Sequence, residues 1–545
     1  MTSPLGKTDR LLGLADTLAG SWGARARATT SSGQERAILR LFGVGGLDRA
    51  GRPLAGATVD RWLTTIPGGL GGGIALPFAM ALLEYDLDPA QLAQDIASGA
   101  VDLALEAELL RRPDRREVAE VEAARLASAA IERIDAERTV RRETIDVLGD
   151  AARPWVGTTM LESDVADALD AAPELIAAGM DLLRVEIPIG RELADRLTDA
   201  GVEVPRWRPG TRPDRRDRMG RNGRRSRNGR LEPIEAAPTG SQRALTELRA
   251  ELDEAAAERR GYVRLATAAP ALWAPESAVV AAFERIDLVE SDPMSEIVVA
   301  GVDPDRALAD HAFAHRLHGR AGTMVVIGPG PLVVGPDLRA GVPSDAATRS
   351  GRALALQLIS VALARAAGVP ARNIVAGAVP AWLVDEPSPA ARSIAEVMVR
   401  RALFPDLALA ITEPSGPDTA DPRASARWPH ILGATLVHAG DAALVLRRGS
   451  RDPRALALGT RAAIAVAAEV AAATLPGSLD GIALEHVHGM LIAAGATLER
   501  LSERGWSALS GDSTSAGGTR PLGADAIAER TEAFDPFAAA LGQRT

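Results

Sequence analysis

The sequence predicts an α/β fold, a TIM-type barrel of eight parallel strands with helices on its outside. From about residue 151, short apolar runs that end in Gly, Pro or Asp alternate with helical stretches rich in Ala, Leu and Arg. Continuous apolar strands that are each followed by a helix are typical of a parallel sheet covered by helices. The number of repeats favours a closed barrel over an open doubly wound sheet. No Gly-x-Gly-x-x-Gly pattern follows the first strand, which counts against a dinucleotide-binding fold.

The composition excludes several classes of protein. With 46% apolar residues, the 545-residue chain can bury a core, so disorder is excluded for most of it. The absence of Cys excludes disulfides, thiolate metal clusters and a cysteine nucleophile. A net charge of −10 gives no general attraction for nucleic acid or anionic lipid. The first ten residues do not resemble a signal peptide, and the most apolar windows, 71–83 and 462–475, are too short to span a membrane. We therefore expect a cytoplasmic protein.

Residues 1–150 are predicted to form a mostly helical N-terminal region. Apolar residues recur at near-helical spacing over 90–110 and again over 117–147. The basic cluster 111–116 between them is expected to be a charged turn.

The barrel is predicted over residues 151–450. Its helices are expected at 241–259, 278–285, 305–317, 346–367 and 389–403. Its strands are expected at 182–187, 262–266, 286–290, 296–299, 323–327, 374–378, 407–411 and 434–437.

An Arg-rich insertion, 206–232, interrupts the predicted barrel. Residues 206–230 include eleven Arg and almost nothing apolar, so this segment cannot bury enough surface to order itself and is expected to be flexible. It could tether a nucleic acid or an acidic partner, attract phosphate as a lid, or be a solvated loop. Residues 451–545 are expected to form a small helical C-terminal extension, with one docking helix after about residue 510.

Reactive groups of such barrels lie where strands end and loops begin. The segment 183–188 ends one strand and holds Arg184 in an apolar setting. The turn 238–243 combines hydroxyls with Gly before a helix, and Tyr262 alternates with Arg264. Two arginines, an anion-binding turn and an aromatic ring would suit a phosphorylated aromatic cofactor. Ordinary capping and turn chemistry is the alternative for each motif. Carboxylates at a further strand exit, Glu290 and Asp292, are additional candidates.

Three histidines, His311, His315 and His318, share one face of a predicted helix. A catalytic metal site would need carboxylate support and an open coordination position, and the His-Glu-x-x-His pattern is absent. A buried or polar helix face is favoured, and no metal is assigned. The Gly-x-Ser-x-Gly elbow and the phosphate-binding Gly-x-x-x-x-Gly-Lys loop are absent too.

Five stretches together resemble the alpha (large) subunit of lysine 5,6-aminomutase. They are TGSQRAL (239–245), YVRLAT (262–267), DPDRALADHAFAH (303–315), VIGPGPL (326–332) and, near the start, ERAILRLFG (35–43). The resemblance covers most of the chain, except the Arg-rich insertion. It implies an isomerase, a radical enzyme that uses pyridoxal 5'-phosphate and adenosylcobalamin.

The resemblance also implies a hetero-oligomer. In this family the large subunit's barrel binds pyridoxal phosphate, while a small (beta) subunit carries the cobalamin domain and the Schiff-base lysine. The chain itself agrees, because a pyridoxal enzyme normally holds its cofactor through a lysine and Lys7 is the only lysine here. The family's cobalamin motif, Asp-x-His-x-x-Gly, is also broken, since Phe313 stands at the Asp position before His315.

The implied reaction, a step in lysine degradation, moves the terminal amino group of D-lysine or β-lysine from carbon 6 to carbon 5. The family's serine near Ile189 and its lysine in a later barrel segment are missing here, which leaves the diamino acid open, D-ornithine included. Two other readings remain: a catalytically inactive barrel that serves as a binding or assembly partner, and a metal-dependent barrel hydrolase on the three-histidine face.

By motif position, the resemblance implies roles for individual residues. Tyr262 would stack on the pyridine ring, and Arg264 would pair with a phosphate or carboxylate. Asp292, or less favourably Glu290, would bind the substrate ammonium or the pyridine edge. Tyr262 and Asp292 are thus the catalytic candidates. The phosphate grip would comprise Arg184, Thr239, Gly240, Ser241, Gln242 and Arg243.

Overall fold

The computed structural model shows a closed barrel of eight parallel strands in sequential order, β2 to β9, which confirms the predicted fold class. The strands are β2 Trp155–Thr159, β3 Leu182–Glu186, β4 Arg264–Ala268, β5 Leu288–Glu290, β6 Met324–Ile327, β7 Ile374–Gly377, β8 Ala408–Thr412 and β9 Ala442–Arg448. The structure describes residues 5–66, 68–159, 165–186, 240–328, 345–379, 387–412, 422–439, 442–448, 453–473, 481–508, 521–531, 534–537 and 541. The whole Arg-rich insertion, 206–232, lies outside these ranges.

Inward-facing side chains of the strands fill the interior of the barrel. Every second residue points inward, and these side chains form one buried cluster from successive strands: Trp155, Leu182, Ala266, Leu288, Val375, Ala410, Leu444 and Leu446. Gly157 makes room for two of them, since a Cβ there would lie 2.8 Å from Leu182 Cδ2 and 3.1 Å from Leu446 Cδ1. The barrel is therefore a packed core that opens only toward the ends of its strands.

Two predicted barrel strands are wrong, and two strands of the observed barrel were missed. Residues 296–299 form a π-helical turn, Glu296–Ala300, because Asp292 caps a helical segment that starts at Pro293. Residues 434–437 lie inside a long helix instead. The missed strands, β2 and β9, carry Gly, Thr or Arg among their apolar residues, so they do not read as continuous apolar runs.

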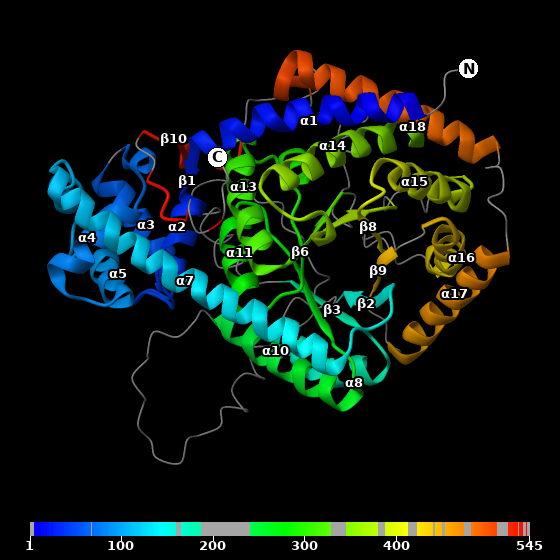
Figure 1. The fold of residues 1–545 in the computed structure, drawn as a ribbon, viewed down its shortest axis with the longest axis horizontal. Helices are drawn as coiled ribbons and strands as arrows, with labels where there is room; N and C mark the ends of the chain where they lie inside the picture. Colours follow the sequence, from blue (N-terminus) through cyan, green and yellow to red (C-terminus); the bar gives the residue numbers. More distant parts are fainter. Residues whose placement is uncertain are drawn as a thin grey trace.

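Helices alternate with the strands and cover the outside of the barrel (Figure 1). Those predicted at 346–367 and 389–403 are confirmed almost to the residue, and α13 begins where the side chain of Asp303 accepts from the Asp305 and Arg306 amides. The layer comprises α8 Val165–Ala177, α10 Gly240–Arg259, α11 Ala274–Phe283, α13 Pro304–Ala321, α14 Ala346–Ala366, α15 Pro389–Leu403, α16 Pro422–Ala439 and α17 Pro453–Ala473.

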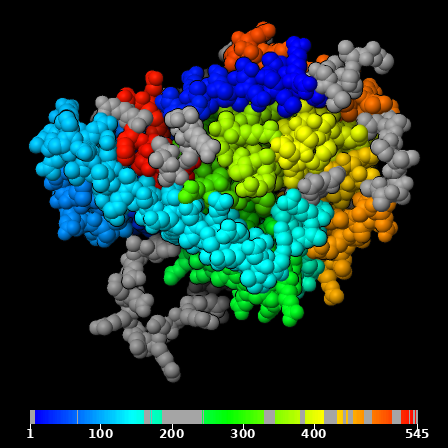
Figure 2. Space-filling view, viewed as in Figure 1, coloured from blue at the N-terminus to red at the C-terminus, as the bar shows by residue number. Residues whose placement is uncertain are grey.

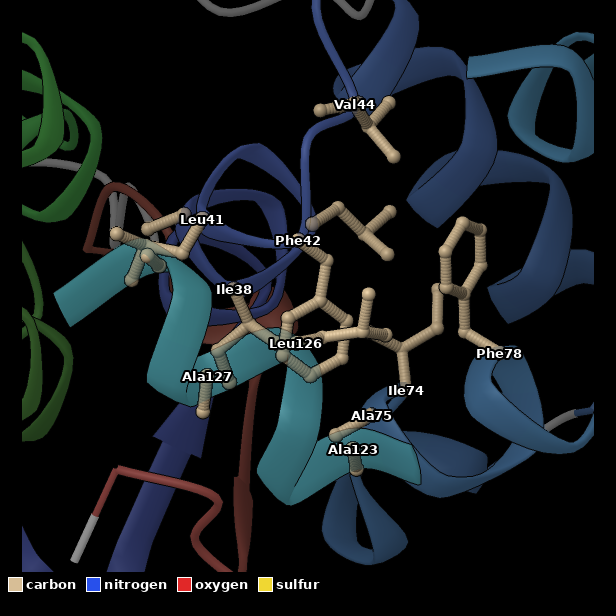
Figure 3. Close-up of a cluster of buried hydrophobic side chains, with 14 of the residues drawn as sticks. Ile38, Leu41, Phe42, Val44, Ile74, Ala75, Phe78, Ala123, Leu126 and Ala127 are labelled. Carbon is tan, nitrogen blue, oxygen red and sulfur yellow. The ribbon is translucent and has the colours of Figure 1, made fainter. Parts of the chain in front are cut away.

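The N-terminal helices lie beside the barrel (Figure 2), and their buried side chains form one cluster with residues of α11 and α13. Figure 3 shows Ile38 of α2, and Phe42 directly after it, close to Leu126, with Phe78 in the same buried cluster. The predicted helix 90–110 is split, because Gly99 takes a left-handed conformation with φ +83. The predicted turn 111–116 is wrong in part, since a helix already begins at Pro113. The helices are α2 Ser32–Leu41, α3 Leu54–Thr65, α4 Ala75–Tyr85, α5 Pro89–Ser98, α6 Leu103–Leu109 and α7 Pro113–Leu148.

The two ends of the chain return to the barrel. The first helix, α1 Leu5–Ala28, lies across α14 and α18 Gly481–Arg504 (Figure 1). The docking helix predicted after residue 510 is not found among the residues described there. Instead, β10 Ile527–Glu529 pairs antiparallel with β1 Thr29–Ser31 and so joins the tail to the N-terminal region.

One described helical stretch, Gly481–Ala508, has the length and apolar composition that a membrane span requires. A single helix of this kind is weak evidence for a span, and α18 packs against α14, α15 and α1 as a core helix would.

Candidate active site at the carboxyl end of the barrel

An arginine and a glutamate meet at the carboxyl end of the barrel. Arg184 on β3 donates from Nε and Nη2 to the two carboxylate oxygens of Glu290 on β5, at 2.8 and 3.0 Å. Their strands are separated by β4, where the small Ala266 and Ala268 stand in register with them. The Arg184 side chain is 4% exposed and that of Glu290 is 20% exposed. A fixed guanidinium fork therefore lies under a carboxylate that is open to the mouth, at the end where such barrels bind ligands.

Asp292 holds the loop after β5 in place. Its Oδ1 accepts from the Met294 and Ser295 amides and from Ser360 Oγ at 2.5 Å, and its Oδ2 accepts from Ser295 Oγ and from the Gly328 amide at 3.2 Å. Both oxygens are thus occupied by donors from three elements. This geometry gives Asp292 a capping role, and the substrate contact that the resemblance implies for it stays a prediction.

The ends of β6 and β7 are joined by a buried glutamine. Gln357 Nε2 donates to the carbonyl oxygens of Ile327 and Gly377, each at 2.9 Å, and Arg400 Nε orients its amide by donating to Oε1 at 2.9 Å. Gly328 fits against it, because a Cβ at this position would lie 2.1 Å from Gln357 Nε2. Its φ of +108 also excludes an ordinary side chain.

Replacing Gly328 with alanine should lower the free energy of unfolding by about 2–3 kcal/mol, from backbone strain and displacement of Gln357. Urea unfolding of the purified chain measures this. Gly433→Ala is the matched control: Gly433 lies inside α16 with no atom within 4 Å of its added Cβ. The control should be neutral or stabilising by about 0.5–1 kcal/mol. Equal midpoints for the two variants would contradict the expectation.

A buried polar chain lies behind β5, on the outer side of the barrel. Ser291 Oγ is 2.9 Å from His311 Nδ1 and 3.4 Å from His315 Nε2. His311 Nε2 is 2.5 Å from a Glu296 oxygen, whose other oxygen accepts from the Leu272 amide. The histidine face predicted from the sequence is thus a buried face, and within the described ranges no group of His, Asp or Glu is arranged to hold a metal.

The histidines further along this face are neutral at pH 7. Burial, with a smaller contribution from the charge of His311, lowers the pKa of His318 to about 3 and that of His315 well below its usual range. Among the described residues, neither ring nitrogen of His318 has a hydrogen-bond partner.

Tyr262 and Arg264 lie at the opposite end of the barrel. The Tyr262 hydroxyl donates to Asp287 Oδ1 at 2.9 Å, and Arg264 stacks on the Trp155 ring at 3.5 Å. Burial and the charge of Asp287 raise the pKa of Tyr262 well above its usual range. The predicted strand began two residues before the observed one; Tyr262 precedes β4, so the structure does not bring it to Arg184.

The predicted phosphate-binding turn is also kept apart from Arg184. Gly240 and Ser241 open α10, and Gln242 Nε2 donates to Glu284 Oε1 at 2.8 Å. Arg243 is exposed, 4.0 Å from Glu247. Later in α10, Arg249 donates to the carbonyl of Val263, just before β4, which holds this helix at the amino-terminal side of the barrel. Thr239 lies outside the described residues.

Sequence reasoning missed two features of the mouth. The pairing of Glu290 with Arg184 follows from the inward alternation of β3 and β5, together with the strand order that places only β4 between them. The contacts of Gln357 have no local signal, because a glutamine inside an apolar helix is not distinctive by itself.

The chain matches a known protein family over most of its length. A family model described as "D-Lysine 5,6-aminomutase TIM-barrel domain of alpha subunit" matches residues 8–200 and 238–421. The lysine 5,6-aminomutase alpha subunit of Acetoanaerobium sticklandii is 26% identical over 347 residues, which are 63% of this chain and 58% of that protein. The protein of the same name from Fusobacterium nucleatum subsp. nucleatum is 24% identical over 348 residues, again 63% and 58%. The matched part thus spans less than two thirds of these relatives.

Among solved structures, dihydropteroate synthases are similar at low level. The protein from Anaplasma phagocytophilum has a TM-score of 0.34 and 13% identity, with 58% of this chain and 100% of that chain covered. The protein from Coxiella burnetii has a TM-score of 0.34 and 10% identity, with 59% and 95% covered. Similarity of this size carries no information about ligand or activity.

Proposed function

This chain belongs to the D-lysine 5,6-aminomutase alpha-subunit family, and from that membership we propose that it is the pyridoxal-phosphate-binding large subunit of a cytoplasmic, adenosylcobalamin-dependent aminomutase. The reaction proposed is the shift of a terminal amino group from carbon 6 to carbon 5 of D-lysine or β-lysine. D-ornithine is the other substrate to be tested. When bound, pyridoxal phosphate would hold the migrating nitrogen and adenosylcobalamin would supply the radical.

The observation that carries the proposal is the Arg184–Glu290 pair at the barrel's mouth. A guanidinium fork binds phosphate oxygens in the same two-point geometry in which Arg184 now binds a carboxylate. We assign the cofactor phosphate to Arg184. Glu290, the more exposed partner, would then receive the ammonium group of the diamino acid, since a carboxylate is the natural partner of an alkylammonium.

The lysine that holds the cofactor must come from a second chain under this proposal. Lys7 is the only lysine here, and it belongs to α1, which lies against α14 and α18 on the outer layer. A small subunit would therefore supply both the lysine and the cobalamin, and would close the mouth against water.

A second candidate function is a barrel without catalysis that binds or assembles a partner. The separation of Tyr262 and Gln242 from Arg184 favours it, because neither of these two residues stands at the mouth with Arg184.

Absorbance titration with pyridoxal phosphate separates the two candidates. The aminomutase proposal expects little binding by the chain alone, a cofactor absorbance band with the small subunit, and adenosylcobalamin-dependent turnover of D-lysine. No band in the assembled pair would refute the aminomutase and leave the non-catalytic barrel.

A further inference from the structure

Two loops at the mouth are tied together by buried side chains. The loop after β4 ends near Leu272, whose amide donates to Glu296, and the loop after β5 begins at Ser291. His311 of α13 bridges them, with Nε2 2.5 Å from Glu296 and Nδ1 2.9 Å from Ser291 Oγ. The residues whose side chains make these contacts, Ser291, Glu296 and His311, are at most 8% exposed.

The direction of the hydrogen bond between His311 and Glu296 follows from the two functional groups. The carboxylate of Glu296 only accepts, so His311 carries its proton on Nε2 and donates to it. The Ser291 hydroxyl lies 2.9 Å from Nδ1, the other nitrogen of the same ring. Glu296 therefore accepts from two donors, the Leu272 amide and His311 Nε2, and so links the loop after β4 to α13.

The loop after β4 is held in a strained conformation. Leu272 has φ +69, the left-handed region, which costs a leucine about 1–2 kcal/mol. Such strain persists only where the surroundings impose it. Here Glu296 holds the Leu272 amide, the Arg36 guanidinium stacks on the neighbouring Trp273 ring at 4.7 Å, and Gly523 packs so closely that a Cβ on it would lie 2.9 Å from Leu272 Cδ2.

Ser291, at the other end of this series of hydrogen bonds, lies next to the proposed site. Ser291 directly follows Glu290, the partner of Arg184, and directly precedes Asp292, which fixes the Gly328 amide. The position of Ser291 therefore constrains the backbone that carries the Glu290 carboxylate.

We propose that Glu296, His311 and Ser291 form a positioning relay that holds the loops after β4 and β5 in the geometry in which Glu290 meets Arg184. These residues act through the loops and do not touch the substrate. The expected effect of the relay on cofactor binding rests on the proposed function. Its effect on the two loops does not.

Hydrogen exchange with mass spectrometry on the full chain alone tests the structural half. In Glu296→Gln the side chain keeps its shape, but the negative charge is lost and one acceptor oxygen remains for two donors, the Leu272 amide and His311 Nε2. In His311→Phe the ring stays and both bonds go. Exchange in the peptide that contains Leu272 should rise by about 10–100-fold in both variants, the loss expected for hydrogen bonds to a charged group.

His318→Phe is the matched control, because His318 lies on the same helix face and is equally buried but has no hydrogen bond among the described residues. Its Leu272 peptide should exchange like that of the unaltered chain. Unchanged exchange in Glu296→Gln, or equal changes in the two Phe variants, would overturn the relay.

Cofactor binding tests the functional half, in the complex with the small subunit. Glu296→Gln should weaken pyridoxal phosphate binding about tenfold, and adding Leu272→Gly should restore part of it, because glycine adopts the left-handed conformation without strain. Loss without rescue would show that the loop after β4 is not the route of the effect. If the unaltered complex never binds the cofactor, the proposed function fails while the exchange result still decides the relay.

Discussion

Replacing Arg184 with methionine should lower the affinity of the assembled protein for pyridoxal phosphate by about 100-fold. Methionine retains much of the side-chain volume but removes the fork, and charge-assisted hydrogen bonds contribute about 1.5–3 kcal/mol. The same change leaves Glu290 without the cation that now neutralises it. Absorbance titration of the complex with the cofactor measures the loss.

Arg365→Met is the matched control for Arg184→Met. Arg365 also contacts both oxygens of a carboxylate, Asp406, with Nη2 at 2.9 Å from each, but its side chain is 38% exposed and lies on the outer helix α14. Its replacement should leave cofactor affinity unchanged and cost less than about 1 kcal/mol of stability. If Arg184→Met binds the cofactor as tightly as this control does, the phosphate is bound elsewhere in the barrel.

Glu290→Gln should separate the two partners at the mouth. Gln keeps a hydrogen-bond acceptor near Arg184 but removes the negative charge, so phosphate binding should hold or tighten while the KM for the diamino acid rises by about tenfold. Steady-state kinetics at saturating cofactor measures this split. A fall in cofactor affinity with an unchanged KM would assign Glu290 to the cofactor instead of the substrate.

The fold could be predicted from the sequence because its signals are local. Asp303 before Pro304 is a cap followed by a helical start, and the apolar runs of β3, β6 and β7 each precede a helix. The predictions failed where tertiary packing overrides the local pattern. Strand β2 tolerates Gly157 because its neighbours' leucines fill that space, and a β-branched run after Asp292 is helical because the cap comes first.

The site was less predictable, for a geometric reason. Whether a polar residue stands at the mouth depends on which end of a strand it occupies, so an error of two residues in β4 is enough to misjudge Tyr262. Arg184 was a candidate because it is a basic residue in the short, otherwise largely apolar segment of β3. No sequence pattern states that Asp292 will have both oxygens occupied, since its donors come from three different elements.

Acid should destabilise the protein through its buried histidines. Because the pKa of His318 in the folded chain is about 3 and the unfolded reference is about 6.5, only the unfolded state takes up this proton between those values. The contribution is constant above about pH 6.5 and is lost progressively as the pH falls toward 3. At pH 4 the loss is on the order of 3 kcal/mol for this group, and His315 acts in the same direction.

The variant His318→Phe isolates this contribution from that of other titrating groups. Burial raises the pKa of Glu35 and Asp310, so these carboxyls favour the folded state at low pH and partly mask the histidines in the unaltered chain. The contributions of these carboxyls cancel when the free energy of urea unfolding of the unaltered chain is subtracted from that of the variant. That difference should be flat above about pH 6.5 and should grow in favour of the variant by about 1.4 kcal/mol for each pH unit below it. Parallel curves from pH 8 to pH 4 would mean that His318 takes up its proton in the folded protein, which requires a partner for its ring nitrogens.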